Sequence, residues 1–290
     1  MEYTKHKTHR IDDQTMQQFT TALKMQERSG ATISKYERDV TAFRKWIGED
    51  TLFGKEQVMQ YKEELQERYA PNSTNSILSA LNTFFRMMDW NDCRISILKV
   101  QRSSFRTSER NLSADEFNRL LKAARDKGMD QLLHIMETIA STGIRIGELP
   151  YITVESLSTR RVVITLTRKT REVLLSIPLC KMLREWCRRK GISSGTIFVT
   201  RNGRPLDRSN IFHMMKSIAE AAGVLRSKVF PHNLRHLFAI NYYEQEKDIV
   251  RLADLLGHSD VNTTRLYTMT TCEKELYALN KVGEAFILGS

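Results

Sequence analysis

The sequence predicts a mainly α-helical protein in two domains, with one small β-hairpin in the second domain. Three observations lead to this prediction. Apolar residues recur at helical spacing through residues 12–92, a polar and basic stretch interrupts the pattern at 99–111, and two β-rich runs flank a charged turn at 167–172. With 290 residues, the chain is long enough to bury a core without disulfide or metal cross-links.

The first domain, residues 1–95, is expected to be a compact bundle of four short helices. In the second of these helices, Ile33, Tyr36, Val40 and Phe43 follow one another at spacings of three and four residues, which places them on one face. Similar apolar stripes occupy residues 16–23, 58–65 and 77–85. Because such stripes must be buried, we expect them to form the core of the domain.

A basic linker is expected at residues 96–111. Its segment "KVQRSSFRTSERN" is polar and contains few apolar residues, which is typical of an extended connection. The linker is either a solvated loop or a segment that contacts nucleic-acid phosphates between two domains. The candidate phosphate contacts are Lys99, Arg102, Arg106 and Arg110.

The second domain, residues 112–290, is expected to be mixed α/β. Ser113 and Glu116 form a capping-box pair at the start of a helix, and a mostly apolar helix follows at 131–143. The β-rich runs at 162–166 and 173–177 predict a hairpin around the turn "TRKTRE", and "TIFVT" at 196–200 predicts a further short strand. Helices are expected at 180–190, at 209–223 and, with breaks, from Pro231 onward.

The net charge of +11 points to a polyanionic partner, with nucleic acid ahead of a membrane surface. Residues 1–95 carry 14 Lys and Arg against 14 Asp and Glu, so the whole surplus lies after residue 95. No apolar run approaches the ~20 residues needed to cross a bilayer, and the N-terminus lacks the apolar core of a signal peptide. The four cysteines are scattered without zinc-binding spacing. We therefore expect a cytoplasmic protein.

Arg145 lies between Gly143 and Gly147 in "TGIRIGEL", where a turn is expected to approach another part of the molecule. Its guanidinium could bind a phosphate, or it could be a salt-bridged structural group. Glu148, three residues further on, could orient Arg145 by pairing with it.

The segment "PHNLRHLF" contains a second group of candidate site residues. His232 and Arg235 project from one face of a helix that is expected to begin at Pro231, and a cationic face near a helix N-terminus favours an anion. His232 and His236 also have the i, i+4 spacing of a zinc pair. We discount a metal because the glutamate of an HExxH motif is absent and Arg235 would repel a cation.

The segments "LGHSDVNTTRLY" and "TRKTRE" supply the remaining candidates. Gly257 is expected to end a helix and "SDVNTT" to cap the next one, which places His258 in a loop and Tyr267 about two turns into the new helix. Alone, Tyr267 would be read as a half-buried aromatic. Lys169, on the hairpin turn, is either an ordinary charged residue or a group that reaches into a groove.

Taken together, two arginines, a lysine, two histidines and a tyrosine fit phosphoryl transfer without a metal, because no carboxylates cluster to hold magnesium. Fixed arginines and a histidine can stabilise the charge on the non-bridging oxygens of a phosphodiester transition state. A phenol, with an unperturbed pKa of ~10, would need a neighbouring base and a cationic field to act as the nucleophile. A lysine on a turn could supply a proton to the leaving oxygen.

The ordered set "TGIRIGEL", Lys169, "HNLRH", "LGH" and Tyr267 resembles the tyrosine recombinases, also called the phage integrase family, over essentially the whole chain. The resemblance implies a SAM-like core-binding domain at 1–95, a catalytic domain at 112–290, and a C-shaped clamp of these two domains around duplex DNA. It implies that Arg145, His232, Arg235 and His258 bind the scissile phosphate, that Lys169 is the general acid and that Tyr267 forms a 3′-phosphotyrosine bond. Glu148 and His236 would have supporting roles.

The hairpin departs from the family pattern "GKGxKxR", because its turn contains no glycine. Lys169 is the only lysine there, and Arg168 and Arg171 flank it as candidate DNA contacts. The register of the catalytic lysine therefore stays open.

The resemblance also implies partners and an assembly. The partner is double-stranded DNA with paired recognition sites. The assembly is a homotetramer on synapsed DNA, formed from monomers or weak dimers. The segment 268–290 would dock on a neighbouring protomer or pack on its own domain. No cofactor is expected, since a phosphotyrosine bond retains the energy of the cleaved bond, and the enzyme would act in the cytoplasm on the nucleoid.

Few residues precede the first helical stripe, which favours a simple Xer-like form over a larger integrase with an arm-binding domain. Its biological role (resolution, inversion, integration or excision, including that of a mobile element) stays open, as do accessory proteins and the DNA sequence of the site. Two other classes are to be weighed against a recombinase. They are a type IB topoisomerase and a non-catalytic DNA-binding regulator.

Overall fold

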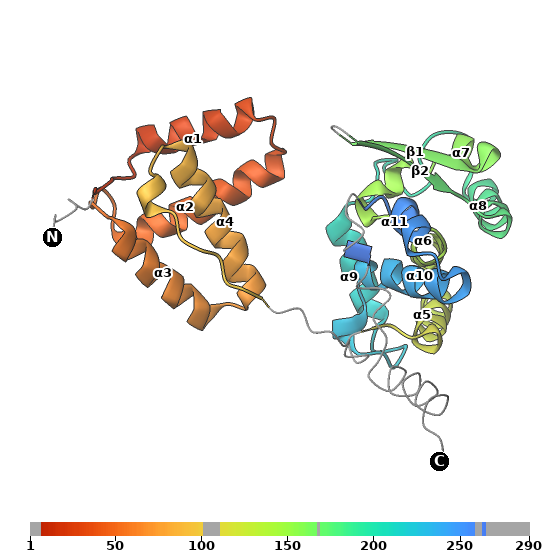
Figure 1. Cartoon of the computed structure of the whole chain (residues 1–290). Coiled ribbons are helices and arrows are strands. Elements are labelled where there is room, and N and C mark those ends of the chain that lie inside the picture. The colour runs from red at the N-terminus through yellow and green to blue at the C-terminus, as the bar shows by residue number, and fades with distance from the viewer. Residues whose placement is uncertain (1–6, 101–110, 167–168, 259–262, 265–290) are drawn as a thin grey trace, which may run out of the picture. The chain divides into compact units, whose positions relative to one another are not determined.

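The computed structural model describes residues 7–100, 111–166, 169–258 and 263–264. The chain forms two compact units, Met1–Arg102 and Ser103–Ser290 (Figure 1). Within the described residues, none of the helices combines the length and the apolar composition that a membrane span requires.

The first unit is a helical bundle whose four α-helices contain the predicted apolar stripes. Helix α1 spans Asp13–Met25, α2 Gly30–Ile47, α3 Lys55–Arg68 and α4 Pro71–Met87, followed by a 3-10 turn at Asn91–Cys93. The side chains of Asp12 and Ser29 accept hydrogen bonds from backbone N–H groups in the first turns of α1 and α2. The core is rich in aromatic side chains, among which Phe19, Phe43, Phe53, Phe84 and Phe85 are fully buried.

In its described residues, the second unit contains helices and one two-stranded antiparallel sheet. Its elements are α5 (Ala114–Asp126), α6 (Asp130–Thr142), a 3-10 turn (Ile146–Tyr151), α7 (Val154–Thr159), β1 (Arg161–Leu166), β2 (Lys169–Leu174), α8 (Ile177–Lys190), α9 (Arg208–Ile218), a 3-10 turn (Arg226–Lys228), α10 (Pro231–Glu246) and α11 (Ile249–Leu256). Ser113 and Glu116 form the predicted capping box, with hydrogen bonds of 3.1 and 2.8 Å. Helix α10 packs against α6 and α11, which brings the start of α10 to the end of α6.

The hairpin is confirmed, but its second strand is shifted from the predicted position. β2 runs over Lys169–Leu174 and not over 173–177, because Ser176 caps α8 and Ile177 already belongs to that helix. In the antiparallel ladder, Leu166 pairs with Lys169 and Ile164 pairs with Arg171. Lys169 therefore lies at the start of a strand and not in the turn.

The predicted strand at 196–200 is wrong. In its place the structure has two isolated bridges, Thr153 with Thr196 and Val199 with Pro205. The segment nevertheless contributes to the core, since Ile197 and Phe198 are buried. Its β-rich composition thus reflects burial of side chains and not membership of a sheet.

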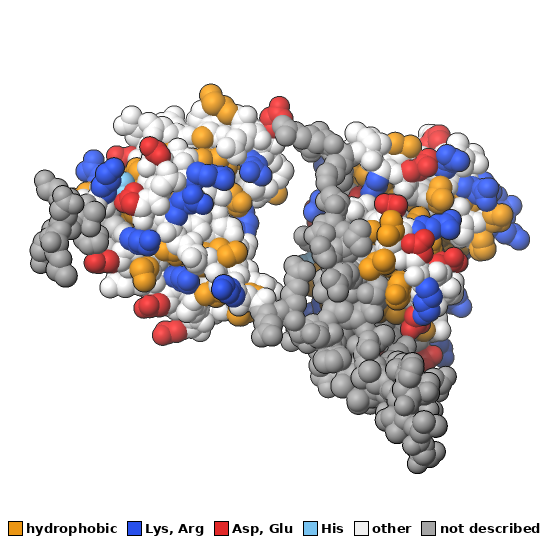
Figure 2. Space-filling view, in the orientation of Figure 1, with side chains coloured by type: hydrophobic (Ala, Val, Ile, Leu, Met, Phe, Trp, Pro, Cys, Tyr) orange, Lys and Arg blue, Asp and Glu red, His pale blue; other side chains and the backbone are white. Residues whose placement is uncertain are grey.

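The basic surplus is not concentrated on the surface seen in Figure 2. On that face, Lys and Arg side chains lie among acidic, apolar and other polar side chains in each unit. The net charge of the chain therefore does not locate a site by itself, and the site has to be found from the arrangement of individual groups.

Candidate active site

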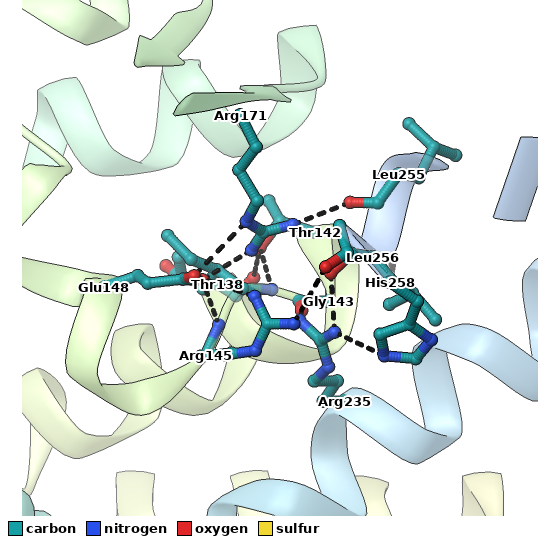
Figure 3. A network of polar contacts seen from close by, with 12 residues as sticks. Thr138, Thr142, Gly143, Arg145, Glu148, Arg171, Arg235, Leu255, Leu256 and His258 are labelled. Carbon is teal, nitrogen blue, oxygen red and sulfur yellow. Dashed lines mark hydrogen bonds and ion pairs between the residues drawn. The ribbon is translucent and has the colours of Figure 1, made fainter. Parts of the chain in front are cut away.

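Four segments that are distant in the sequence meet within the second unit. They are the turn after α6, the middle of β2, the first turn of α10 and the end of α11 (Figure 3). The polar groups of these segments form one connected network of hydrogen bonds and ion pairs.

Gly143 ends α6 in the left-handed conformation, with φ of 63°. A Cβ atom at this position would lie 2.5 Å from Cδ1 of Phe238 and 2.9 Å from Cδ2 of Leu256. Glycine is required here because a side chain has no space and the positive φ would be strained. The predicted close approach at this turn is therefore observed, and it places the turn against α10 and α11.

Arg145 and Glu148 pair as the sequence suggests. Nη1 of Arg145 donates to Oε1 of Glu148 at 2.9 Å, and the backbone N–H of Arg145 donates to Oε2 at 2.8 Å. Nη2 of Arg145 donates to the carbonyl oxygen of Gly257 at 3.2 Å. The side chain of Arg145 is 41% exposed and that of Glu148 only 2%, so a buried carboxylate holds an accessible guanidinium in place.

Arg171 contacts the same carboxylate from β2. Its Nε and Nη2 donate to the two oxygens of Glu148, and its Nη1 donates to the carbonyl oxygen of Leu255 at 2.8 Å. Its side chain is only 12% exposed, so the structure places it inside the site and not on a DNA-facing turn as the sequence reasoning expected. Arg171 shares the alternation of the buried Val173 and Leu175. Because alternate residues of a strand point to the same face, this spacing in the sequence could have predicted that Arg171 points inward.

The charge balance around Glu148 follows from these contacts. Burial alone would raise the pKa of Glu148, but hydrogen bonds from Arg171 and Arg145 and the positive charge of Arg171 lower it below its usual value. Glu148 is therefore ionised at neutral pH, and it compensates part of the positive charge of two arginines.

Arg235 is the most buried guanidinium of the site, with only 3% of the residue exposed. It donates to the carbonyl oxygen of Gly143, to that of Leu256 at 2.7 Å and to Nε2 of His258 at 3.0 Å. One side chain thus joins the end of α6, the start of α10 and the end of α11 (Figure 3). These contacts fix the direction of the guanidinium before any ligand binds.

His258 follows Gly257, which ends α11 with φ of 63°. Because Arg235 can only donate, Nε2 of His258 accepts, and the ring proton lies on Nδ1. Nδ1 then donates to Oγ1 of the fully buried Thr264 at 2.9 Å. Burial, followed by the positive charges of Arg235, Arg145 and Arg171, lowers the pKa of His258 to about 4.

In the free protein, the ring of His258 is expected to stay neutral from pH 8 down to pH 6 and to titrate with a midpoint near pH 4. The ¹⁵N shifts of the imidazole, assigned with a His258→Gln variant, report both the midpoint and the tautomer. A midpoint above pH 6, or a proton on Nε2 at neutral pH, would contradict the arrangement.

A pocket of about 300 Å³ lies beside this network. It is lined by residues 144–148, Arg208, Pro231, His232 and Arg235. Its ionised groups are three arginines and the carboxylate of Glu148, and the exposed His232 stands on the first turn of α10. A helix N-terminus and an excess of guanidinium groups make this a pocket for an anion.

Arg208 is not among the site residues that the sequence predicts. It is the first residue of α9, and it shares no motif with the other site residues. Because the contact of α9 with the turn after α6 depends on tertiary packing, the sequence carries no local signal of it.

Several predicted site residues are not placed. Tyr267, Arg168, Arg102, Arg106 and Arg110 lie outside the described residues, as does the segment 268–290. The backbone of Lys169 is described, two residues before Arg171 in β2. Lys99 is exposed in the first unit, and His236 is buried in α10.

Potential metal ligands gather elsewhere in the described part of the chain. His9, Asp92 and Cys93 lie together in the first unit, where Nε2 of His9 already contacts Asp92 at 2.9 Å. In the pocket of the second unit, the single carboxylate is paired with two arginines. Those groups are suited to an anion and not to a divalent cation.

The fold and the site define a two-unit, mainly helical protein with a pre-arranged cationic pocket in its second unit. A model described as the phage integrase family matches residues 110–274, and one described as the phage integrase N-terminal SAM-like domain matches residues 16–91. The chain belongs to the phage integrase family.

Individual relatives point to the Xer-like tyrosine recombinases within this family. The chain is 28% identical over 269 residues to the tyrosine recombinase XerD of Vibrio cholerae, covering 84% of this chain and 87% of that protein. It is 26% identical over 274 residues to the tyrosine recombinase XerA of Pyrococcus furiosus, covering 91% and 92%. Its fold is similar to that of lambda integrase in a tetramer bound to a Holliday junction, with a TM-score of 0.71, 18% identity and coverage of 91% and 78%.

Proposed function

We propose that the chain is a site-specific DNA recombinase. It cleaves a strand of a recognition site through a 3′-phosphotyrosine bond and then joins the cut end to a partner strand through a Holliday junction. The observation that carries this proposal is the convergence of Arg145, His232 and Arg235 on one anion pocket, with His258 bonded to Arg235.

The arrangement supports binding of a phosphodiester. Arg145 and Arg235 are each held by carbonyl oxygens of the turn at the end of α11, so their guanidinium groups need no rearrangement when charge develops on the phosphate. A bound phosphate competes with Nε2 of His258 for the N–H of Arg235. Its negative charge also raises the pKa of His258, which favours a proton on Nε2 that can be donated to the phosphate.

In the proposed reaction, the phenol oxygen of Tyr267 attacks the phosphorus and the bond from phosphorus to O5′ breaks. The phenol loses its proton to a base, and O5′ takes up a proton, which we assign to Lys169 as the general acid. In the reverse of this step, the 5′-hydroxyl of a partner strand attacks the phosphotyrosine and the bond from phosphorus to the phenol oxygen breaks. The hydroxyl proton passes to Lys169 and the phenol of Tyr267 regains its proton, which restores a phosphodiester. Since each step exchanges one ester for another, no external energy source is needed.

We assign a separate role to each of the predicted domains. Residues 1–95 form the core-binding domain, 96–111 the basic linker and 112–290 the catalytic domain, and the two domains close on duplex DNA as a clamp. The linker residues Lys99, Arg102, Arg106 and Arg110, together with Arg168, contact phosphates. The clamp and these contacts are predictions from the sequence.

The partners are double-stranded DNA with paired sites and further copies of the chain. The lambda integrase named above forms a tetramer on a Holliday junction, and we propose a tetramer on synapsed DNA here, with the segment 268–290 docking between protomers. The enzyme is expected to act on the nucleoid in the cytoplasm.

A plasmid assay in EDTA separates this function from its competitors. Plasmids with one or two copies of the cognate site are incubated with the protein, and recombinant products and topoisomers are resolved on gels. The recombinase yields products only from two-site plasmids. Relaxation of one-site plasmids without recombination would identify a type IB topoisomerase, and DNA binding without any strand exchange or relaxation would identify a regulator.

A further inference from the structure

Arg208 is an exposed arginine at the start of α9, directly after the N-cap residue Asp207. It forms no hydrogen bond or ion pair with other groups in the described ranges, although it lines the anion pocket. Arg145 and Arg171, by contrast, both pair with Glu148. Arg208 therefore adds to the pocket a guanidinium whose donors are unused within the described ranges, and the adjacent carboxylate of Asp207 interacts with it through charge alone.

Gly147 explains how Arg208 reaches this position. A Cβ atom at Gly147 would lie 2.8 Å from Nη2, 2.9 Å from Cζ and 2.9 Å from Nε of Arg208. Three guanidinium atoms at nearly equal distance mean that the group covers the backbone of Gly147. The missing side chain thus lets Arg208 lie against the turn that carries Arg145 and Glu148.

This placement has an electrostatic consequence. The guanidinium groups of Arg145, Arg208 and Arg235 line one pocket and repel one another. The carboxylate of Glu148 offsets only part of that repulsion, because it pairs with Arg145 and also with Arg171. An anion in the pocket would relieve it. A guanidinium with its donors unused is also the group best suited to a phosphate, since it can donate two parallel hydrogen bonds.

We propose that Arg208 binds a backbone phosphate of the cleaved DNA strand, at the scissile phosphate or its immediate neighbour. This inference rests on the proposed function, because it takes the anion of the pocket to be that strand. Gly147 is the positioning residue, since it provides the space that Arg208 occupies.

The test compares four variants on a nicked half-site that traps the covalent adduct. Arg208→Ala is expected to slow single-turnover cleavage by about tenfold or more. It should also make the dependence of the DNA-binding constant on salt concentration less steep. In a plot of log binding constant against log salt concentration, the slope should change by the amount expected for the loss of about one phosphate contact. Arg208→Lys should retain part of the activity. Gly147→Ala should reproduce the cleavage defect of Arg208→Ala, because its Cβ displaces the guanidinium while the charge of the protein stays the same.

Arg204→Ala is the matched control. Arg204 is exposed in the loop before α9, carries the same charge and does not line the pocket. Wild-type cleavage by Arg208→Ala, or an equal defect in Arg204→Ala, would overturn the proposal.

A methylphosphonate scan locates the contact. Replacing the contacted phosphate with this neutral group should remove the difference in cleavage rate between the wild type and Arg208→Ala. A loss of that difference only at a phosphate more than one position from the cleavage point, or at none, would overturn the proposal. If the wild type forms no adduct on any cognate site, the proposed function fails instead. The salt slope then still tests phosphate binding by Arg208.

Discussion

Replacing Glu148 with alanine is expected to destabilise the second unit strongly and to abolish cleavage. Glu148 is 2% exposed and accepts hydrogen bonds from Arg145 and Arg171. Without it, the largely buried guanidinium of Arg171 loses its counter-charge, and removal of one partner of such a pair typically costs about 3–5 kcal/mol. Urea denaturation of the wild type and of Glu148→Ala measures the loss in the free energy of unfolding. The trapped-adduct assay measures the loss of activity.

Glu172→Ala is the matched control for this change. Glu172 lies on the same strand as Arg171, and it contacts Arg161 at 3.4 Å with 46% of its side chain exposed. Exposed pairs contribute about 0–1 kcal/mol, so little loss is expected. If Glu148→Ala were as stable as Glu172→Ala, the proposed role of Glu148 would be wrong.

The pH dependence offers a second readout of Glu148. Its pKa is lowered in the folded protein from an ordinary value of 4.5. The contribution of the ionised Glu148 to the stability of the folded protein is therefore fully present above pH 4.5, and it is lost as the pH falls through the lowered pKa. The stability difference between the wild type and Glu148→Gln should accordingly be large at pH 7 and shrink on acidification below pH 4.5. A difference that is constant with pH would contradict the charged role.

Replacing Arg235 with alanine is expected to reduce cleavage by about 10²–10³-fold, the usual loss when one donor to a developing oxyanion is removed. The same change removes the hydrogen bonds that Arg235 donates to the carbonyl oxygens of Gly143 and Leu256 and to Nε2 of His258. Arg235→Lys should recover little of the cleavage rate, because a single ammonium group cannot donate to all the acceptors that the planar guanidinium reaches. Single-turnover adduct formation at saturating protein measures the effect.

Arg184→Ala controls for the loss of an arginine that binds a carbonyl oxygen elsewhere in the second unit. Nη2 of Arg184 donates to the carbonyl oxygen of Leu157, and Arg184 does not line the anion pocket. We expect its cleavage rate to stay near that of the wild type when circular dichroism shows a folded protein. A folded Arg235→Ala that cleaves as fast as Arg184→Ala would exclude Arg235 from phosphate binding.

Local patterns in the sequence predict much of this fold. The cap of Ser113 and Glu116, the stripe from Ile33 to Phe43 and the hairpin each depend on residues close together in the chain. The pairing of Arg145 with Glu148 belongs to the same group, since it spans three residues. Propensity and spacing are sufficient for such features, because their geometry is set within one element.

The rest of the site depends on contacts between distant segments. Arg235 and Gly143 are 92 positions apart, and their contact exists because α10 packs against α6. Arg171 reaches Glu148 through the true register of β2, which the sequence reasoning had shifted toward α8. Arg208 enters the pocket only because Gly147 leaves space for it. No spacing rule within one helix or strand contains this information.

Adduct formation by Tyr267 tests the central claim most directly. A nicked half-site of the cognate DNA is incubated in EDTA with the wild type and with Tyr267→Phe, and protein–DNA adducts are resolved by denaturing electrophoresis. We expect a covalent adduct with the wild type, its phosphate on Tyr267 by mass spectrometry, and none with Tyr267→Phe, while both proteins bind the DNA equally. An adduct that persists in Tyr267→Phe, or a wild type that binds its site and forms none, would contradict the account.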